Sequence, residues 1–348
     1  MTQATLDFRS DTVTKPTPEM REAMAKAEVG DDVYQEDPTI NHLQELAAEI
    51  TGMEAGLFVP SGTMGNLTSI LSHCQRGDEI IVGRKAHIFL YEAAGAAALG
   101  GINIQTIPNQ KDGTLAFEDL EAAIRPEDPH QPVTRLVSLE NTHNRCDGSS
   151  LSPQYIKEVA DFAHQHHLKF HLDGARIFNA AIDQNVAVAE LTKNADSVTF
   201  CLSKGLSAPV GSVICGSKDF INRALRTRKQ LGGGMRQAGI IAAAGIVALN
   251  SMVDRLIEDH QNAKLLAEGL ANIPGIEIDL ENQHTNMVYF SLSQHFPISL
   301  PELTKRLKEQ GLLVGGESHR IRMVTHAWVD KTDINQALDI INLILTNL

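Results

Sequence analysis

The sequence predicts an α/β protein in which a mostly parallel, seven-stranded sheet lies between helices and is followed by a smaller α/β unit. Two observations support this fold class. Short apolar runs alternate with amphipathic stretches over most of the chain, and the pattern changes its rhythm after Leu270. Alternating strand and helix patterns are typical of parallel sheets that are covered on both faces.

Each expected element has its own stretch of sequence. Seven apolar runs are expected to be strands: 57–59, 80–82, 102–107, 135–139, 169–172, 197–202 and 211–215. Apolar residues at three- and four-residue spacing predict helices over 63–74, 87–99, 117–124 and 153–167. The small residues of 238–250 merge into an amphipathic pattern that reaches Leu270, which predicts a helix linking two domains. Beyond it, strands over 277–280, 287–292, 312–315 and 321–325 surround a helix over 301–310, and a last helix runs from 332 towards 347.

The pattern divides the chain into an N-terminal arm over 1–17, a large domain over 18–252 and a small domain over 253–348. A chain of 348 residues is long enough for two cores. The arm is dense in polar side chains between Asp7 and Lys15. It either lies across a site or a neighbouring subunit, or forms a solvated terminus.

Composition narrows the possible partners and compartments. With 43% hydrophobic and 21% charged residues and a net charge of -13, the chain has an ordinary globular composition. It lacks the basic surface that nucleic-acid binding requires. There is no uncharged apolar run of membrane-spanning length, and no apolar signal core in the first ten residues. We therefore expect a cytoplasmic protein that binds neither nucleic acid nor a membrane.

Cysteine and histidine do not predict a metal site. The four cysteines are too far apart for a CxxC pattern and are expected to be buried, reduced thiols. Several histidines gather between His164 and His171, across a helix end and the next strand, without an HExxH pattern. We expect these side chains to be solvated rather than to bind a metal.

A phosphate could be held where the first strand of the sheet meets its helix. The segment 60–66, PSGTMGN, joins these two elements. The amides of Gly62 and Thr63 could bind an anion at the helix N-terminus, whereas in the simpler interpretation Ser61 or Thr63 only caps the helix.

Two further chemical groups end expected strands. Asp173 follows a buried strand, where it either meets a cationic ligand, caps the next helix or pairs with Arg176. Lys204 ends another apolar strand, where desolvation would lower the pKa of its amine and favour Schiff-base chemistry. Together with the phosphate site, these residues supply what pyridoxal 5'-phosphate requires: a phosphate cradle, an anion for the pyridine nitrogen and an amine for the aldehyde.

Over nearly its whole length the sequence resembles the low-specificity L-threonine aldolases, pyridoxal phosphate enzymes of fold type I, the aspartate aminotransferase type. The resemblance is carried by LDFRSDTVT at 6–14, GDDVY at 30–34, PSGTM at 60–64, AHI at 86–88, LENTHN at 139–144, LDGAR at 172–176, LSKG at 202–205, GGGMRQ at 232–237 and RMVTH at 322–326. It implies an aldehyde lyase that cleaves L-threonine or L-allo-threonine, and other β-hydroxy-α-amino acids, to glycine and acetaldehyde or the corresponding aldehyde.

The resemblance also implies a cofactor site. Lys204 would form the Schiff base (internal aldimine) with pyridoxal phosphate, and Asp173 would keep the pyridine nitrogen protonated. Gly62 and Thr63 would hold the phosphate, and His87 would stack on the ring. Without the resemblance, the alternative for His87 is an N-terminal helix residue that faces solvent.

The substrate site follows from the same resemblance. Arg176, which also belongs to the cofactor site, Arg322 and Ser10 would grip the substrate carboxylate. His130 matches a second histidine near the substrate hydroxyl. Either His87 or His130 would remove the hydroxyl proton, directly or through water.

Three further residues resemble groups that one subunit offers to the site of another. These are Tyr34 and Lys229 near the substrate, and Arg236 near the cofactor. The resemblance therefore implies a homo-oligomer, a dimer or a dimer of dimers, with its active site at the dimer interface. On sequence alone, Tyr34 and Arg236 could also be ordinary surface residues.

Other functions remain open at this stage. Another fold-type-I enzyme, a β-eliminating lyase or a transaminase, would share Lys204 and Asp173 and differ in its products. A non-catalytic pyridoxal phosphate carrier would bind the cofactor without turnover. A nicotinamide oxidoreductase is disfavoured because the first strand–helix turn lacks GxGxxG. Arg145 and Ser207 depart from the family pattern in two loops, which leaves local loop shape and substrate preference open.

Overall fold

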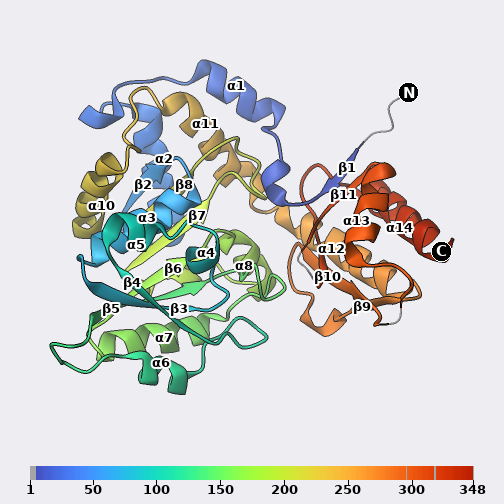
Figure 1. Ribbon diagram of the computed structural model, residues 1–348. Coiled ribbons are helices and arrows are strands. Elements are labelled where there is room, and N and C mark those ends of the chain that lie inside the picture. Colours follow the sequence, from blue (N-terminus) through green and yellow to red (C-terminus); the bar gives the residue numbers. More distant parts are fainter. Residues whose placement is uncertain (1–4, 295, 317–318, 348) are drawn as a thin grey trace.

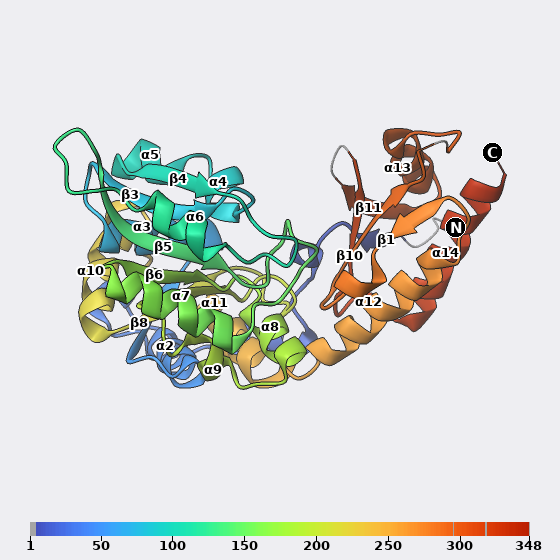
Figure 2. The same cartoon turned by 90° about the horizontal axis from the view of Figure 1, so that it is seen from below.

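Two sheets, each with its own core, organise the molecule (Figure 1). The computed structural model describes residues 5–294, 296–316 and 319–347. The large sheet has the order β2-β8-β7-β6-β5-β3-β4 and the small one the order β1-β11-β12-β10-β9. Figure 2 shows the two domains side by side, with helices on both faces of the large sheet.

The large sheet confirms the predicted seven strands. They are β2 (Ala55–Val59), β3 (Asp78–Gly83), β4 (Asn103–Ile107), β5 (Val133–Glu140), β6 (Lys169–Asp173), β7 (Ser197–Cys201) and β8 (Ser212–Gly216). Only β8 runs against its neighbours β2 and β7, so the sheet is mostly parallel, as expected. Strands β7 and β8 are buried on both faces, which explains their continuous apolar runs.

Helices cover both faces of this sheet. The helices on one face are α3 (Gly62–His73), α5 (Gly95–Gly100) and α10 (Lys218–Gln230). Those on the other face are α2 (Pro38–Thr51), α6 (Phe117–Ala123) and α7 (Pro153–Gln165), with α11 (Gly239–Val247) on α2 and α1 (Pro18–Lys26) on α11. The short helices α8 (Ile177–Gln184) and α9 (Val188–Thr192) connect β6 to β7. The crossover helices thus lie where the periodicity predicted them, with one exception.

The exception is the expected helix over 87–99, which was wrong. The structure has two short helices there, α4 (His87–Leu90) and α5, separated by Ala93 and Ala94 at φ of 51° and 55°. Residues other than glycine rarely adopt these left-handed φ values, so the backbone is strained at the break between the two helices. Between the two helices, Glu92 is buried and its carboxylate contacts His87 and Asn66.

The small domain packs helices against its own sheet. Its strands are β9 (Ile276–Ile278), β10 (Met287–Leu292), β11 (Leu312–Gly316) and β12 (Ile321–Val324), and its helices are α12 (Leu256–Ala271), α13 (Leu300–Glu309) and α14 (Lys331–Thr346). The fifth strand, β1 (Leu6–Phe8), comes from the N-terminal arm and pairs in parallel with β11. Because Leu6, Phe8 and Asp11 are buried, the arm is not a solvated terminus over these residues.

The link between the domains is bent, so the continuous helix expected over 238–270 was also wrong. Helix α11 passes into a π-helical turn, η3 (Ala248–Met252), before α12 begins, and the two arms meet at 68°. A π-helical turn is a common site of kinks.

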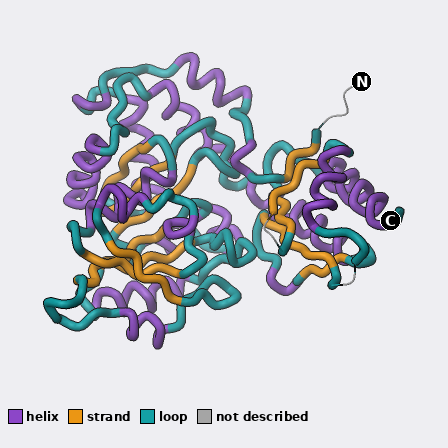
Figure 3. Tube along the Cα trace, in the orientation of Figure 1, coloured by secondary structure: helices purple, strands orange, loops and turns teal. Residues whose placement is uncertain are grey.

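Within the described ranges no single helix is long and apolar enough to cross a membrane. The bent pair of α11 and α12 passes the test of length and apolar composition only when its two arms are counted together. We retain 18–252 and 253–348 as proposed domain boundaries. The tube view shows the helical link entering the small domain (Figure 3).

Candidate active site

Two adjoining cavities lie where the strand ends of the large domain meet the arm and the small domain. The outer cavity, of about 320 Å³, is lined by Ser10, Thr12, His87, Tyr91, Asn144, Arg145, Arg176, Lys204, Gly316 and Arg322. The inner cavity, of about 170 Å³, is lined by Ser61, Gly62, Thr63, Asn66, His87, Glu92, Asp173, Ala175, Cys201, Ser203 and Lys204. His87 and Lys204 line both cavities, so the two cavities adjoin at these side chains.

The inner cavity begins at the N-terminus of α3. Ser61 caps this helix, and its Oγ accepts a hydrogen bond of 3.2 Å from the Met64 amide. The amides of Gly62 and Thr63 belong to the first turn, which has no intrahelical acceptors for them. A Cβ on Gly62 would meet the Cys201 Sγ at 2.9 Å, so glycine lets α3 start close to β7. This arrangement suits an anion such as a phosphate.

Asp173 lies at the end of β6 and is 2% exposed. Its Oδ2 accepts a hydrogen bond from Asn66 at 2.9 Å, and its Oδ1 accepts one from the Ala175 amide at 3.2 Å. Its carboxylate does not pair with Arg176, whose side chain is held by Asp11. The interpretation that Arg176 serves Asp173 was therefore wrong, and the carboxylate faces the cavity as a partner for a cationic ligand.

His87 begins α4 and is held by two carboxylates. Its backbone amide donates to Glu140 Oε2 at 2.7 Å, and its Nδ1 lies 2.9 Å from Glu92 Oε1. Burial lowers the pKa of His87, but the hydrogen bond to Glu92 and the charges of Asp173, Glu92 and Glu140 outweigh burial, so this pKa lies above its ordinary value. With its imidazole lining both cavities, His87 is not simply a solvent-facing helix residue.

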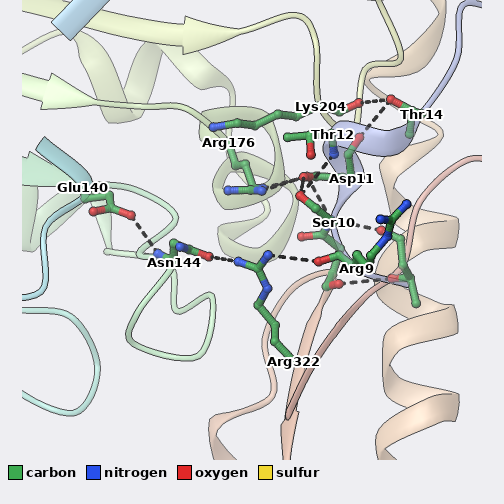
Figure 4. Close-up of polar contacts among 12 residues, drawn as sticks. Arg9, Ser10, Asp11, Thr12, Thr14, Glu140, Asn144, Arg176, Lys204 and Arg322 are labelled. Atoms are coloured by element: carbon green, nitrogen blue, oxygen red, sulfur yellow. Dashed lines mark hydrogen bonds and ion pairs between the residues drawn. The ribbon is translucent and has the colours of Figure 1, made fainter. Parts of the chain in front are cut away.

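Lys204 follows β7, where the sequence placed it. Its carbonyl accepts a hydrogen bond of 2.9 Å from Thr14 Oγ1, which ties the arm to this turn. Figure 4 shows the lysine side chain extending from this contact towards the space beside Arg176. The amine is thereby placed at the junction of the two cavities.

Two arginines line the outer cavity, and Figure 4 shows Arg176 beside the Lys204 amine. The buried Arg176 donates from Nε and Nη2 to Asp11 at 2.7 and 2.6 Å. Burial alone would raise the pKa of Asp11. The charge and hydrogen bonds of Arg176 lower this pKa by more than burial raises it, so the pKa of Asp11 lies far below its usual range. Arg322, on β12, donates to Asn144 Oδ1 at 2.7 Å and to the Arg9 carbonyl at 3.0 Å. Two guanidinium groups in one cavity suit a carboxylate.

Four predicted residues line neither cavity. His130 lies on the loop between α6 and β5, pairs with Asp128 and has a side chain that is 88% exposed. Tyr34 is 71% exposed, and Arg236 pairs with Asp31 at the surface. Lys229 lines a separate cavity beside α10. A single chain therefore does not bring these four side chains to Lys204.

Several site residues were missed by the sequence analysis. Asp11 lies in the polar stretch of the arm and Asn66 in the segment 60–66, so both had a signal. Glu92 had none, because the helical period hides the break that turns it inward. Within the described ranges, His87, Glu92 and Asp173 form the one group whose possible metal-ligand atoms all lie within 4.8 Å of one another, and that group lines the inner cavity.

The expectation for the histidines near α7 was only partly right. His164 is about half exposed and bonds to Asp196. His171, by contrast, is fully buried on β6, so its expected solvation was wrong. It stays neutral there because burial lowers its pKa to about 4. All four cysteines are buried and free, as predicted.

Known proteins resemble this chain over nearly its whole length. A family model described as beta-eliminating lyase matches residues 7–293. Low-specificity L-threonine aldolase 1 of Arabidopsis thaliana is 49% identical over 344 residues, which cover 97% of this chain and 96% of that protein. The low specificity L-threonine aldolase of Escherichia coli strain K12 is 48% identical over 329 residues, covering 94% and 96%.

A solved structure resembles the fold as well. The threonine aldolase of Leishmania major superposes with a TM-score of 0.83, at 19% identity, over 98% of this chain and 99% of that one. At this identity the likeness shows the fold, which is that of fold type I. The two curated relatives are close to half identical to this chain over nearly its full length. The chain therefore belongs to the low-specificity L-threonine aldolase family.

Proposed function

We propose that this protein cleaves L-threonine and L-allo-threonine, and other β-hydroxy-α-amino acids, to glycine and the corresponding aldehyde with pyridoxal 5'-phosphate. The observation that carries the proposal is the pair of cavities joined by His87 and Lys204. One cavity offers an anion site and a buried carboxylate, and the other offers two arginines. The family supports an aldolase over a β-eliminating lyase or a transaminase.

The inner cavity fits the cofactor. The N-terminal amides of α3 at Gly62 and Thr63 would hold the phosphate, Asp173 would face the pyridine nitrogen, and the Lys204 amine would bind the aldehyde covalently. The imidazole of His87 would stack on the ring. When bound, pyridoxal phosphate supplies an electron sink for the bond that breaks between Cα and Cβ.

The arginines orient the substrate. Asp11 takes two of the five N–H donors of Arg176, and no described protein group accepts from the other three. Together with Arg322 and the Ser10 hydroxyl, these donors would grip the substrate carboxylate and fix the direction of the bond that breaks. Asp11 thus holds the Arg176 guanidinium in place and leaves three of its N–H groups to bind the substrate.

His87 can take up the proton of the substrate hydroxyl. Because Glu92 is an acceptor, it favours the tautomer in which Nδ1 carries the hydrogen and Nε2 the lone pair. We propose that Nε2 accepts the hydroxyl proton as the aldehyde leaves. His130 lies outside both cavities of its own chain, so a role there would require a second subunit.

We further propose a homo-oligomer, a dimer of dimers, in the cytoplasm. Exposed Tyr34 next to exposed Val33, and Arg236 half exposed at the same surface, support an interface there. The partner's copy of this surface would bring Tyr34, Lys229 and Arg236 to the site. The free, buried cysteines fit a reducing compartment.

Mixing two inactive variants tests the shared site. Lys204→Ala and Arg236→Ala chains, inactive alone, form mixed dimers in which one site has both defects and the other has none. Recovery of activity after mixing supports a shared site, with light scattering giving the size of the assembly. Intact dimers that exchange subunits without recovery contradict it.

The first test of the reaction is acetaldehyde release from both threonine diastereomers, followed with a coupled dehydrogenase with and without added pyridoxal phosphate. We expect cofactor-dependent release. Lys204→Ala should lose the yellow absorbance of the bound cofactor and lose turnover. A yellow protein that forms pyruvate or a keto acid instead of glycine and aldehyde would be an eliminating lyase or a transaminase.

A further inference from the structure

A network of buried hydrogen bonds runs from Asp173 and Glu92, at the wall of the inner cavity, into the core beneath α3. Asn66 Nδ2 donates to Asp173 Oδ2 at 2.9 Å and to Glu92 Oε1 at 2.8 Å. Asn66 Oδ1 lies 3.2 Å from His171 Nε2. The chain continues from His171 Nδ1 to Ser197 Oγ at 2.8 Å, and from there to His73 Nε2 at 2.8 Å.

The fold brings these residues together through one face of the sheet. His171 and Asp173 are two positions apart on β6, so both side chains point to the same face. Ser197 is the register partner of His171 on β7, and Thr199 is the partner of Asp173. Helix α3 covers this face closely, because a Cβ on Gly65 would meet Thr199 Cγ2 at 2.4 Å. That close approach places Asn66, the next residue, over β6.

Every hydrogen bond in this network is donated in the direction of the Asp173 and Glu92 carboxylates. Two carboxylates require the amide nitrogen of Asn66 on their side, so its oxygen faces His171 and needs a donor there. His171 Nε2 therefore carries the hydrogen, and Nδ1 accepts from the Ser197 hydroxyl. Ser197 in turn accepts from His73 Nε2, which leaves His73 Nδ1 unprotonated; that buried atom has no hydrogen-bond partner. Burial lowers the pKa of both histidines, to about 4 for His171 and about 3 for His73, which agrees with neutral rings.

We propose that Asn66 and His171 are positioning residues that hold the Asp173 carboxylate aimed at the pyridine nitrogen of the cofactor. The proposal rests on the proposed function, because it requires pyridoxal phosphate in the inner cavity. Hydrogen bonds to the charged form of a carboxyl group favour that form. A carboxylate held at the ring nitrogen would keep that nitrogen protonated, and the protonated ring is the stronger electron sink.

The test measures the ring nitrogen directly. The enzyme is loaded with pyridoxal phosphate labelled with ¹⁵N in the ring, and the nitrogen chemical shift is recorded against pH. Asn66→Ala removes the donor to Asp173, and we expect the proton affinity of the ring nitrogen to fall about tenfold or more. The kcat for threonine should fall in the same variant with little change in KM, because the arginines are untouched.

Two variants of His171 separate positioning from mere structure. His171→Leu fills the space but offers no donor to Asn66, so the proton affinity should fall, by less than in Asn66→Ala. His171→Gln has both a donor and an acceptor and should restore most of the loss. Ser69→Ala, a buried polar change on the same helix outside the chain of bonds, is the matched control and should leave the nitrogen unchanged.

The outcomes are distinct. If folded Asn66→Ala and His171→Leu enzymes keep a protonated nitrogen and the kcat of the Ser69→Ala control, the proposal is overturned. If Asn66→Ala does not fold, the two variants at 171 still decide the proposal, since a glutamine no better than a leucine contradicts it. If a variant at 171 does not fold, a folded Asn66→Ala enzyme that keeps a protonated ring nitrogen contradicts it. A wild-type protein that binds the labelled cofactor in protonated form but does not cleave threonine overturns the proposed function alone. A wild-type protein that binds no cofactor overturns both.

Discussion

Replacing Asp11 by asparagine would show how strongly the ion pair beneath the outer cavity stabilises the fold. Asp11 is fully buried and Arg176 is 7% exposed. Both oxygens of the carboxylate accept from the guanidinium, at 2.7 and 2.6 Å. Asparagine has the same shape but no charge, and its amide nitrogen cannot accept a hydrogen bond. The substitution therefore leaves a buried cation with one of these two bonds lost.

The magnitude follows from burial. Removing one partner of a buried ion pair costs about 3–5 kcal/mol, because the other charge stays buried without compensation. A whole protein is stable by only about 5–15 kcal/mol, so the loss is a large fraction of the total. The pair also depends on pH. The pKa of Asp11 is lower in the folded state than in the unfolded state, so its stabilisation is complete above the unfolded pKa and is lost as the pH falls through the folded pKa.

Urea unfolding of the cofactor-free protein at fixed protein concentration measures the effect. The control is Asp161→Asn, which breaks an exposed ion pair with Lys157 on α7 and should cost at most about 0.5 kcal/mol. We expect the difference between wild type and Asp11→Asn to be large at neutral pH and to shrink on acidification. Equal losses for the two variants, or a loss for Asp11→Asn that stays constant down to strongly acid pH, would refute the reasoning.

Two further predictions concern the site. Glu92→Gln removes a carboxylate that raises the pKa of His87, so the acid limb of the kcat/KM profile for threonine should move to lower pH. A limb that stays in place contradicts His87 as the proton acceptor. Gly62→Ala places a Cβ 2.9 Å from the Cys201 Sγ, so we expect pyridoxal phosphate binding, measured by equilibrium dialysis, to weaken about tenfold. Adding Cys201→Ala removes the close contact and should restore binding. A double variant that binds as weakly as Gly62→Ala alone contradicts this account of the glycine.

The large sheet could be predicted because strands such as β3, β7 and β8 are buried on both faces. Such strands appear in the sequence as continuous apolar runs, as 197–202 illustrates, and their order along the chain needs no knowledge of distant contacts. The helix over 87–99 could not be predicted correctly. Its periodicity continues through Ala93 and Ala94, whose left-handed backbone is imposed by the fold rather than by residue type.

The same distinction holds for the site. Asp173 and Lys204 could be found because polar residues that end buried strands meet at one edge of a parallel sheet. The role of Asp11 could not be found in this way. Its partner Arg176 lies 165 positions away, and only the path of the arm from the small sheet back across the cavity brings the two together. Whether Tyr34 reaches a site depends on a second subunit, which no periodicity in one chain describes.

One carboxylate connects the two ends of the proposed substrate site. Glu140, at the end of β5, accepts from the His87 amide through one oxygen and from the Asn144 amide through the other, at 2.7 and 2.9 Å. Asn144 then accepts from Arg322 on β12 of the small domain (Figure 4). His87, the proposed proton acceptor, and Arg322, the proposed carboxylate-binding arginine, are thus both held from the same strand end, although they come from different domains. Since Arg322 also donates to the carbonyl of Arg9 in the arm, the position of the small domain is part of the geometry of the site rather than a cover over it.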